Sequence, residues 1–333
     1  MYLNNIFLDI LADFKKEQYK LKRILSRKFS FKNGCSIIIS LQNDMNKREI
    51  SFLLGNNYDM DLLKTLPKWK GMEQRISIIN DESGSNEYII FSQLEGYEAK
   101  IYEAVMQDII NNMEKISSVN DLGKLLNLIL SKWKNFFKNE NSLVMQEIEQ
   151  QGLYAELLML EKLIKIRGSR MVYCWSGCEG ETHDFYIDKN TVEVKSSSRK
   201  EQNMIKISSE YQLDNVGLSG NLYLSFFKLR KSAVDGEKLS DIVERIQNLL
   251  DDVTVSEFND KLFKYGYLVQ CKELYNYKFT LLEDSYYNVL DGFPRIVASN
   301  IPKGVSGISY TISLDACDRF QITAESFYNE VII

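Results

Sequence analysis

Hydrophobic and polar residues follow two different periods along the chain, and these periods predict its secondary structure. Residues 3–27 carry apolar side chains at helical spacing among many lysines, which predicts an amphipathic helix. Turn-rich segments then separate short apolar runs that predict four strands, at Cys35–Leu41, Glu49–Leu54, Arg75–Ile79 and Tyr88–Phe91. Helical spacing returns over residues 98–116 and 119–138, so residues 1–140 are expected to form an N-terminal α+β region.

A long helical pattern followed by short strand patterns marks the rest of the chain. Ser142 is a candidate N-cap for a helix that continues to about residue 166. The next strand patterns lie at Met171–Trp175, Thr182–Ile187, Val192–Ser196, Met204–Ile207 and Leu222–Leu229. Helices near residues 239–250 and 255–264 then precede strand patterns at Tyr267–Gln270, Tyr277–Leu282 and Ile308–Leu314. This order predicts an α/β core at residues 141–232 and a C-terminal α+β region at residues 233–333.

The composition is typical of a folded globular protein that does not enter membranes. Hydrophobic residues make up 44% of the 333 residues and charged residues 26%. No apolar run approaches the ~20 residues that a membrane span needs, and the apolar N-terminal segment lacks the basic start of a signal peptide. The five cysteines are odd in number and lack zinc-site spacing, so we expect reduced thiols. These features predict a cytoplasmic protein.

The single histidine, His183, narrows the chemistry available to one chain. A Ser–His–Asp or Cys–His mechanism could use only this residue, and a site with several histidines is excluded. The P-loop and the glycine-rich dinucleotide-binding motif are both absent from the sequence. Any catalysis is therefore expected to come from carboxylates, lysines and a metal ion, or from partners.

A predicted hairpin at residues 182–196 brings charged side chains together. Side chains alternate faces along a strand, so Glu193 and Lys195 share one face. A two-residue loop at residues 189–190 would place Asp184 opposite Lys195, and a loop one position earlier would place it opposite Glu193. Either register gathers the three side chains, whereas a three-residue loop would separate Asp184 from the others.

The helix expected before this hairpin carries a carboxylate within its apolar stripe. Glu156 lies three residues after Leu153 and four before Leu160, both of which belong to the stripe. A carboxylate on a buried face is costly unless it is paired or binds a metal ion. The small residues Gly152 and Ala155 would let this helix approach a sheet closely. Glu156 is therefore expected to join the charged residues of the hairpin.

This combination resembles the PD-(D/E)XK nuclease superfamily, whose motif joins a helix acid, a strand Asp and Glu-x-Lys on the next strand. The matching residues are Glu156, Asp184 and Glu193-Val194-Lys195. The wider chain is similar to a bacterial family of PD-(D/E)XK motif proteins encoded beside restriction and phage-defence genes. That similarity rests on Gly152–Leu157, Trp175–Gly177, His183–Phe185, Val192–Ser196, Ser208–Leu213 and Phe293–Arg295. Two residues depart from the family pattern. His183 stands where a Pro is common, and Ala155 stands where a Gly is expected before the helix Glu. Neither change removes a metal ligand.

The resemblance implies a restriction-endonuclease-like α/β fold, with a mixed central sheet flanked by helices, and a Mg²⁺-dependent deoxyribonuclease in which Mn²⁺ can substitute. Asp184, Glu193 and the Val194 carbonyl would bind the ion, while Glu156 would act through water or hold a second ion. Lys195 would orient the attacking water or stabilise charge in the transition state. Gln212 would position Lys195 or the scissile phosphate, although it fits a helix surface equally well.

The net charge opposes the simplest form of this hypothesis. A protein that holds DNA alone should have a basic surface, but the net charge is −5. A local basic stretch consists of Lys195, Arg199, Lys200 and Lys206. DNA binding is therefore expected to depend on other subunits of a defence complex or on a homodimer. The alternative is a catalytically inactive assembly or DNA-binding subunit that retains the nuclease fold. His183 would be structural or contact a DNA phosphate.

Overall fold

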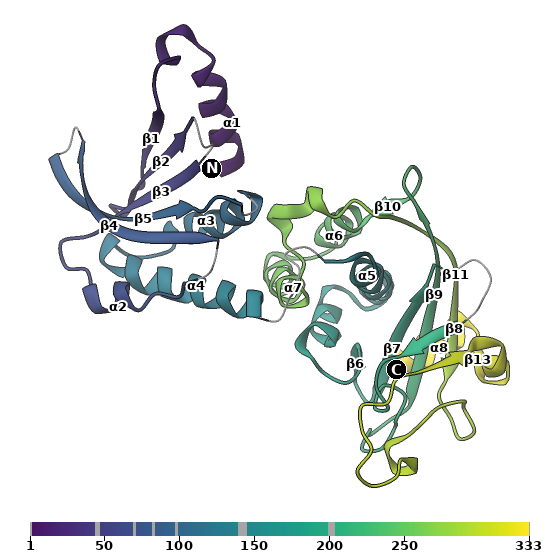
Figure 1. The fold of residues 1–333 in the computed structure, drawn as a ribbon. Helices are drawn as coiled ribbons and strands as arrows, with labels where there is room; N and C mark the ends of the chain where they lie inside the picture. Colours follow the sequence, from purple (N-terminus) through teal and green to yellow (C-terminus); the bar gives the residue numbers. More distant parts are fainter. Residues whose placement is uncertain are drawn as a thin grey trace. The chain divides into compact units, whose positions relative to one another are not determined.

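The computed structural model describes residues 2–332 apart from 44–46, 69–70, 82–83, 97–98, 139–144 and 199–203. The expected cap at Ser142 and two residues of the basic stretch, Arg199 and Lys200, lie outside the described residues. The chain divides into two compact units, Met1–Leu143 and Val144–Ile333, which are coloured purple to blue and teal to yellow in Figure 1. No helix among the described residues is long and apolar enough to span a membrane.

The described strands of the N-terminal unit form one antiparallel sheet. Its order is β1-β2-β3-β5-β4, with bounds Ile24–Ser30, Ser36–Gln42, Lys47–Leu53, Gly84–Gln93 and Met72–Asp81. The helices of this unit are α1 (Leu3–Phe14), α2 (Met60–Lys64), α3 (Ala99–Met113) and α4 (Leu122–Lys138). The expectation of one helix over residues 3–27 is wrong, because the chain turns after α1 and pairs residues 24–30 with β2. These residues form an edge strand and are mostly exposed, so their sequence lacks the regular apolar alternation that predicts a strand.

A mixed sheet forms the centre of the C-terminal unit (Figure 1). Its order is β10-β11-β9-β7-β6, with bounds Glu237–Lys238, Lys278–Asn288, Leu222–Ser232, Asn190–Ser197 and Phe185–Ile187. β7 and β9 are parallel, whereas the other pairs are antiparallel. The short strand β13 (Gln321–Ile322) also pairs with β11, and β8 (Met204–Ile207) pairs with β12 (Tyr310–Ser313). The expected α/β class with a mixed central sheet is confirmed.

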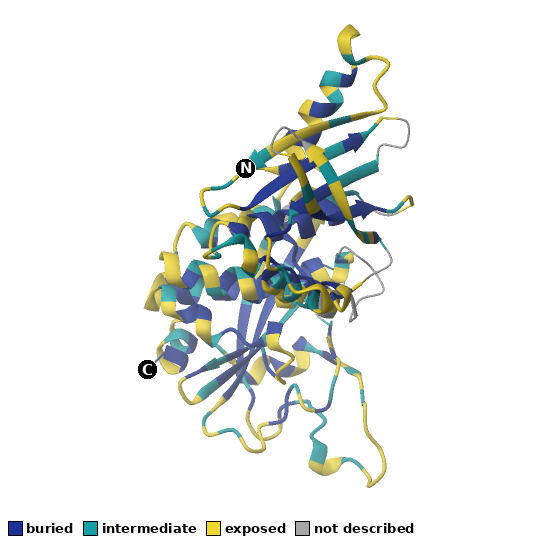
Figure 2. Ribbon diagram, turned by 90° about the vertical axis from the view of Figure 1, so that its left-hand side faces the viewer, coloured by how far each residue is buried: buried dark blue, intermediate teal, exposed yellow. Residues whose placement is uncertain are grey.

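Both faces of this sheet are covered, as the dark-blue strands in Figure 2 illustrate. Along β9, Tyr223 and Phe227 belong to one apolar cluster and Leu224 and Phe226 to another, as the alternation of a strand requires. The first cluster joins the sheet to four helices: α5 (Glu147–Arg167), α6 (Leu239–Gln247), α7 (Asp252–Tyr265) and α8 (Ala324–Ile332). The second cluster joins it to β8, β12 and the segments around them.

Three expectations for this part of the chain need correction. Met171–Trp175 is not a strand: Ser169–Cys174 forms a 3₁₀ helix, and Trp175 makes one isolated bridge to Phe185. Val269–Leu274 is also a 3₁₀ helix where a strand at Tyr267–Gln270 was expected. Both are short apolar runs whose burial comes from packing on helices, and periodicity alone cannot separate that from a buried strand. Residues 233–333 do not form a separate unit, because β11 pairs with β9 inside the same sheet.

Candidate active site

The hairpin β6–β7 sets the positions of the acidic side chains. Phe185 pairs with Val192 and Ile187 with Asn190, so residues 188–189 form the loop and Asp184 falls opposite Glu193. This is the second of the two registers expected from the sequence. Asp188 adopts a positive φ of 54° in this loop, a conformation that Asp tolerates better than most residues.

Asp184 is fixed by its own backbone and by its side chain. Its carbonyl accepts hydrogen bonds from the backbone N–H groups of Ser176 (2.8 Å) and Gly177 (3.1 Å). Its Oδ2 atom accepts a hydrogen bond of 2.7 Å from the backbone N–H of Val194 on the neighbouring strand. These contacts hold the carboxylate at the start of the hairpin.

Glu193 and Lys195 occupy one face of β7, as the alternation predicts. The side chain of Glu193 is fully buried, and its Oε1 atom forms an ion pair with Lys195 Nζ. The other oxygen, Oε2, is also buried and has no hydrogen-bond partner among the described residues. A buried carboxylate oxygen without a partner is costly, so this atom marks a place where a cation or donor would be stabilising.

Glu156 is held from two sides by aromatic donors. Trp175 Nε1 donates to Glu156 Oε2 and the Tyr265 hydroxyl donates to Oε1, both at 2.7 Å. The two rings stack at 6.0 Å between centroids. Trp175 is buried as expected, and in addition it orients this carboxylate. Tyr265, at the end of α7, was not identified from the sequence because nothing local distinguishes it from the other tyrosines.

Gly177 lies where Glu156 and Asp184 converge. A Cβ atom at this position would lie 2.5 Å from Glu156 Oε2 and 2.8 Å from Asp184 Oδ1. Any side chain here would therefore occupy the space that the two carboxylates face. The helix acid and the strand acid are brought together, as the sequence predicts, and glycine leaves room between them.

A comparison with protein families identifies the chain. Residues 12–315 match the model of the family described as "Putative PD-(D/E)XK family member, (DUF4420)". The chain belongs to this family. The resemblance to PD-(D/E)XK proteins is therefore confirmed, and the match extends over both compact units. No curated protein and no solved structure matches the chain.

In this PD-(D/E)XK family member the negative charges of the three acids, when ionised, outnumber the one positive charge beside them. Burial raises the pKa of Glu193 to about 8, and Asp184 adds to the shift while Lys195 opposes it. Burial and Asp184 also hold the pKa of Glu156 well above its usual range, and burial raises the pKa of Asp184. Burial lowers the pKa of Lys195, but Glu193 and Asp184 outweigh it and the net shift is upward. One ammonium group, that of Lys195, thus faces three acids, of which Glu156 and Glu193 are buried and Asp184 is partly buried.

This imbalance fits a divalent cation, which would stabilise the ionised carboxylates. Asp184, Glu193 and the Val194 carbonyl are the oxygen donors that would hold it. Within the described residues, no three His, Cys, Asp or Glu side chains already form a metal-binding group. The fit therefore rests on two carboxylates and a backbone carbonyl, and Glu156, whose oxygens already accept hydrogen bonds, would act through water.

The other candidate residues have different surroundings. The amide oxygen of Gln212 accepts a hydrogen bond of 2.8 Å from Ser208 N within a turn after β8, so its role at the site stays a prediction. His183 is buried, and burial followed by the charge of Lys195 lowers its pKa to about 4. A neutral, buried imidazole favours a structural role over a phosphate contact. Lys206 is exposed on β8, and Cys174 and Cys178 are free thiols.

Proposed function

We propose that this chain is a Mg²⁺-dependent DNA endonuclease that acts within a bacterial restriction or phage-defence system in the cytoplasm. The observation that carries the proposal is the convergence of Glu156 and Asp184 at Gly177, next to a partly buried ion pair of Glu193 and Lys195. The family match supports a nuclease-like fold. DNA as substrate and the defence role go beyond that match and are part of the proposal.

Phosphodiester hydrolysis requires the kinds of group that this site contains. The phosphate is anionic and the departing alkoxide is a poor leaving group, so negative charge must be neutralised as it develops. A bound Mg²⁺ would supply this neutralisation and a more acidic water. Lys195, whose side chain is 16% exposed, can donate to a phosphoryl oxygen or orient the attacking water. Trp175 and Tyr265 keep Glu156 from rotating away.

A second candidate is an assembly subunit that keeps the nuclease fold without cleaving DNA. Two observations favour it: the net charge of −5 gives little attraction for DNA, and Lys195 is already engaged by Glu193. In the first reading, other subunits of the defence complex or a second copy of this chain supply the missing basic surface. The two candidates differ in whether the chain has any divalent-dependent activity.

Nicking of supercoiled plasmid in Mg²⁺ or Mn²⁺ by the purified chain, with the partner subunits added if the chain alone is inactive, tests the proposal. We expect nicking by the wild type that chelation abolishes, and a loss of at least about a hundredfold in Asp184→Asn, since a charged ligand is removed. Asp188→Asn is the matched control, because Asp188 belongs to the same hairpin but pairs with Arg167 at the surface. Equal activity of wild type and Asp184→Asn would favour the assembly subunit.

A further inference from the structure

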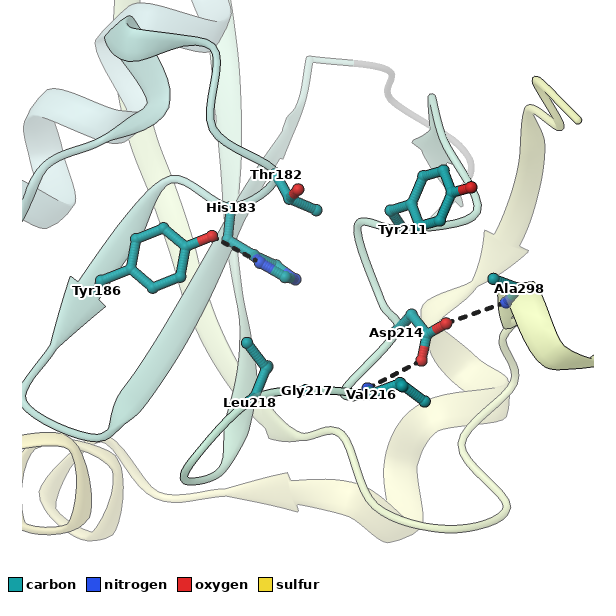
Figure 3. A pocket seen from close by; sticks show the side chains of 9 residues that line it. All are labelled: Thr182, His183, Tyr186, Tyr211, Asp214, Val216, Gly217, Leu218 and Ala298. Atoms are coloured by element: carbon teal, nitrogen blue, oxygen red, sulfur yellow. Dashed lines mark hydrogen bonds between the residues drawn. The ribbon is translucent and has the colours of Figure 1, made fainter.

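A pocket with a volume of about 290 Å³ opens beside the acidic cluster in the C-terminal unit. Its walls include Thr182, His183 and Tyr186 from the catalytic hairpin and Tyr211, Asp214 and Leu218 from the segment after β8 (Figure 3). His183 directly precedes Asp184 and Tyr186 follows two residues later. One wall of the pocket is therefore built by the same short segment that supplies an acid of the candidate active site.

His183 presents an unused hydrogen-bonding atom to this pocket. The residue is 3% exposed, and its Nδ1 atom lies 3.3 Å from the Tyr186 hydroxyl. Its Nε2 atom is buried and has no hydrogen-bond partner among the described residues. Figure 3 shows the imidazole ring directed into the pocket, with Tyr186 behind it and Tyr211 on the opposite wall. A ligand with a polar edge would satisfy this atom.

The lining favours a flat, uncharged group over a phosphate. The residues around the pocket, all of them described, include no lysine or arginine. They include the carboxylate of Asp214, which would repel an anion. Tyr211 is 51% exposed, so its ring is available for stacking. A nucleobase combines a π face for stacking with a hydrogen-bonding edge.

The outer wall of the pocket is held in place before any ligand arrives. Asp214 accepts hydrogen bonds from the backbone N–H groups of Val216 (3.1 Å) and Ala298 (3.0 Å). Arg295 donates to the Leu213 carbonyl at 2.6 Å. These contacts tie the segment with Tyr211 to a distant part of the chain, so little ordering is needed on binding.

We propose that this pocket receives an unstacked nucleobase next to the scissile phosphate. The base would stack on Tyr211 and meet His183 Nε2 with its polar edge. The proposal rests on the proposed function and deepens it, since it assigns a binding place to the nucleotide that adjoins the cleaved bond. It also provides a route to substrate affinity that does not require a basic surface.

Photo-crosslinking locates the base without requiring catalysis. The probe is a single-stranded DNA decamer of 5-iodo-deoxyuridine, mixed with the full chain in Ca²⁺ and irradiated. We expect mass spectrometry to find crosslinks at His183, Tyr186 or Tyr211. Crosslinks only elsewhere, or none at all, would overturn the proposal. Plasmid nicking by the wild type in that case would leave the proposed function standing, so the two failures can be told apart.

Substitution of Tyr211 then tests the stacking. The affinity of the decamer, measured by fluorescence anisotropy, should fall at least about fivefold in Tyr211→Ala and stay near the wild-type value in Tyr211→Phe, which keeps the ring. The control is Tyr173→Ala, since Tyr173 is 50% exposed in the same unit and lies outside the pocket lining. An unchanged affinity in Tyr211→Ala, or an equal loss in Tyr173→Ala, would contradict the proposal.

Discussion

At the scale of single residues, Glu156 shows how the site is held by side chains far apart in the sequence. Its two oxygens accept hydrogen bonds from Trp175, 19 residues away, and from Tyr265, 109 residues away. Trp175 is buried with the carboxylate and Tyr265 is partly buried beside it, so bulk water does not readily replace either donor. Loss of either donor would leave a buried acceptor unsatisfied, which costs more than an average hydrogen bond contributes.

The variant Tyr265→Phe removes one of these donors and keeps the ring. We expect it to reduce the free energy of unfolding by about 1–2 kcal/mol, because Glu156 loses a partner in a buried place. For a unit of this size the transition temperature should fall by roughly 2–4 °C per kcal/mol in scanning calorimetry. Tyr277→Phe is the control, since Tyr277 is 39% exposed. Equal transition temperatures would mean that Tyr265 does not support Glu156.

The sequence predicted that the three acids and the lysine lie together, but it did not predict the groups that hold them in place. Alternation along one strand was sufficient to place Glu193 and Lys195 on one face. Two of the three loop lengths considered for the hairpin placed Asp184 beside them, and one of these two is observed. The hydrogen bonds that Trp175 and Tyr265 donate to Glu156 depend instead on how distant segments pack. Such contacts have no period in the sequence and could not be predicted from it.

At the scale of elements, a tight turn links the helix acid to the hairpin. Gly177 begins the short 3₁₀ helix Gly177–Glu179, and the N–H groups of Ser176 and Gly177 bind the Asp184 carbonyl. This turn also follows Trp175, whose carbonyl accepts a hydrogen bond of 2.5 Å from the buried Lys261 on α7. The turn therefore connects three elements that supply the site: α5, α7 and the β6–β7 hairpin.

The variant Gly177→Ala tests this turn. Its Cβ atom would overlap both Glu156 and Asp184, so the two carboxylates should be pushed apart and Mn²⁺ affinity should fall about tenfold or more. Calorimetric titration measures the change. Gly123→Ala is the control, because the nearest atom to its Cβ would lie at an acceptable 3.4 Å. Wild-type affinity in Gly177→Ala would show that the space over this glycine is not used by the ion.

Elements with a clear period were predicted well, and short apolar runs were not. The helix carrying Glu156 was expected to continue to about residue 166 and spans Glu147–Arg167, and β7, β8 and β9 lie where strands were expected. Residues 169–174 form a 3₁₀ helix that buries Met171 and Val172. A short apolar run of this kind has the same sequence pattern as a buried strand. The strand β1 was missed because its burial is low.

At the scale of the whole molecule, residues 233–333 complete the unit that holds the acids. β11 extends the sheet, α6 and α8 cover it, and α7 brings Tyr265 to Glu156. The α/β class was therefore predictable from the order of elements, and the boundary expected at residue 140 lies close to the observed one at residue 143. The sequence did not show that residues 144–333 form one unit, because the pairing of β11 with β9 joins segments far apart in the chain. The family match covers both units. In the proposed function, the net charge of −5 makes DNA binding depend on partner subunits or a homodimer.

Calorimetric titration of the full chain with Mn²⁺ tests the central claim, that the acids hold a divalent ion. We expect binding by the wild type and by Asp188→Ala, and none by folded Asp184→Ala or Glu193→Ala. Since the pKa of Glu193 is raised to about 8, binding must displace its proton below that pH. The affinity should therefore be about fiftyfold weaker at pH 6 than at pH 8, since about half of Glu193 is ionised at pH 8 and about one-hundredth at pH 6. Undiminished binding in Asp184→Ala and Glu193→Ala would contradict the account.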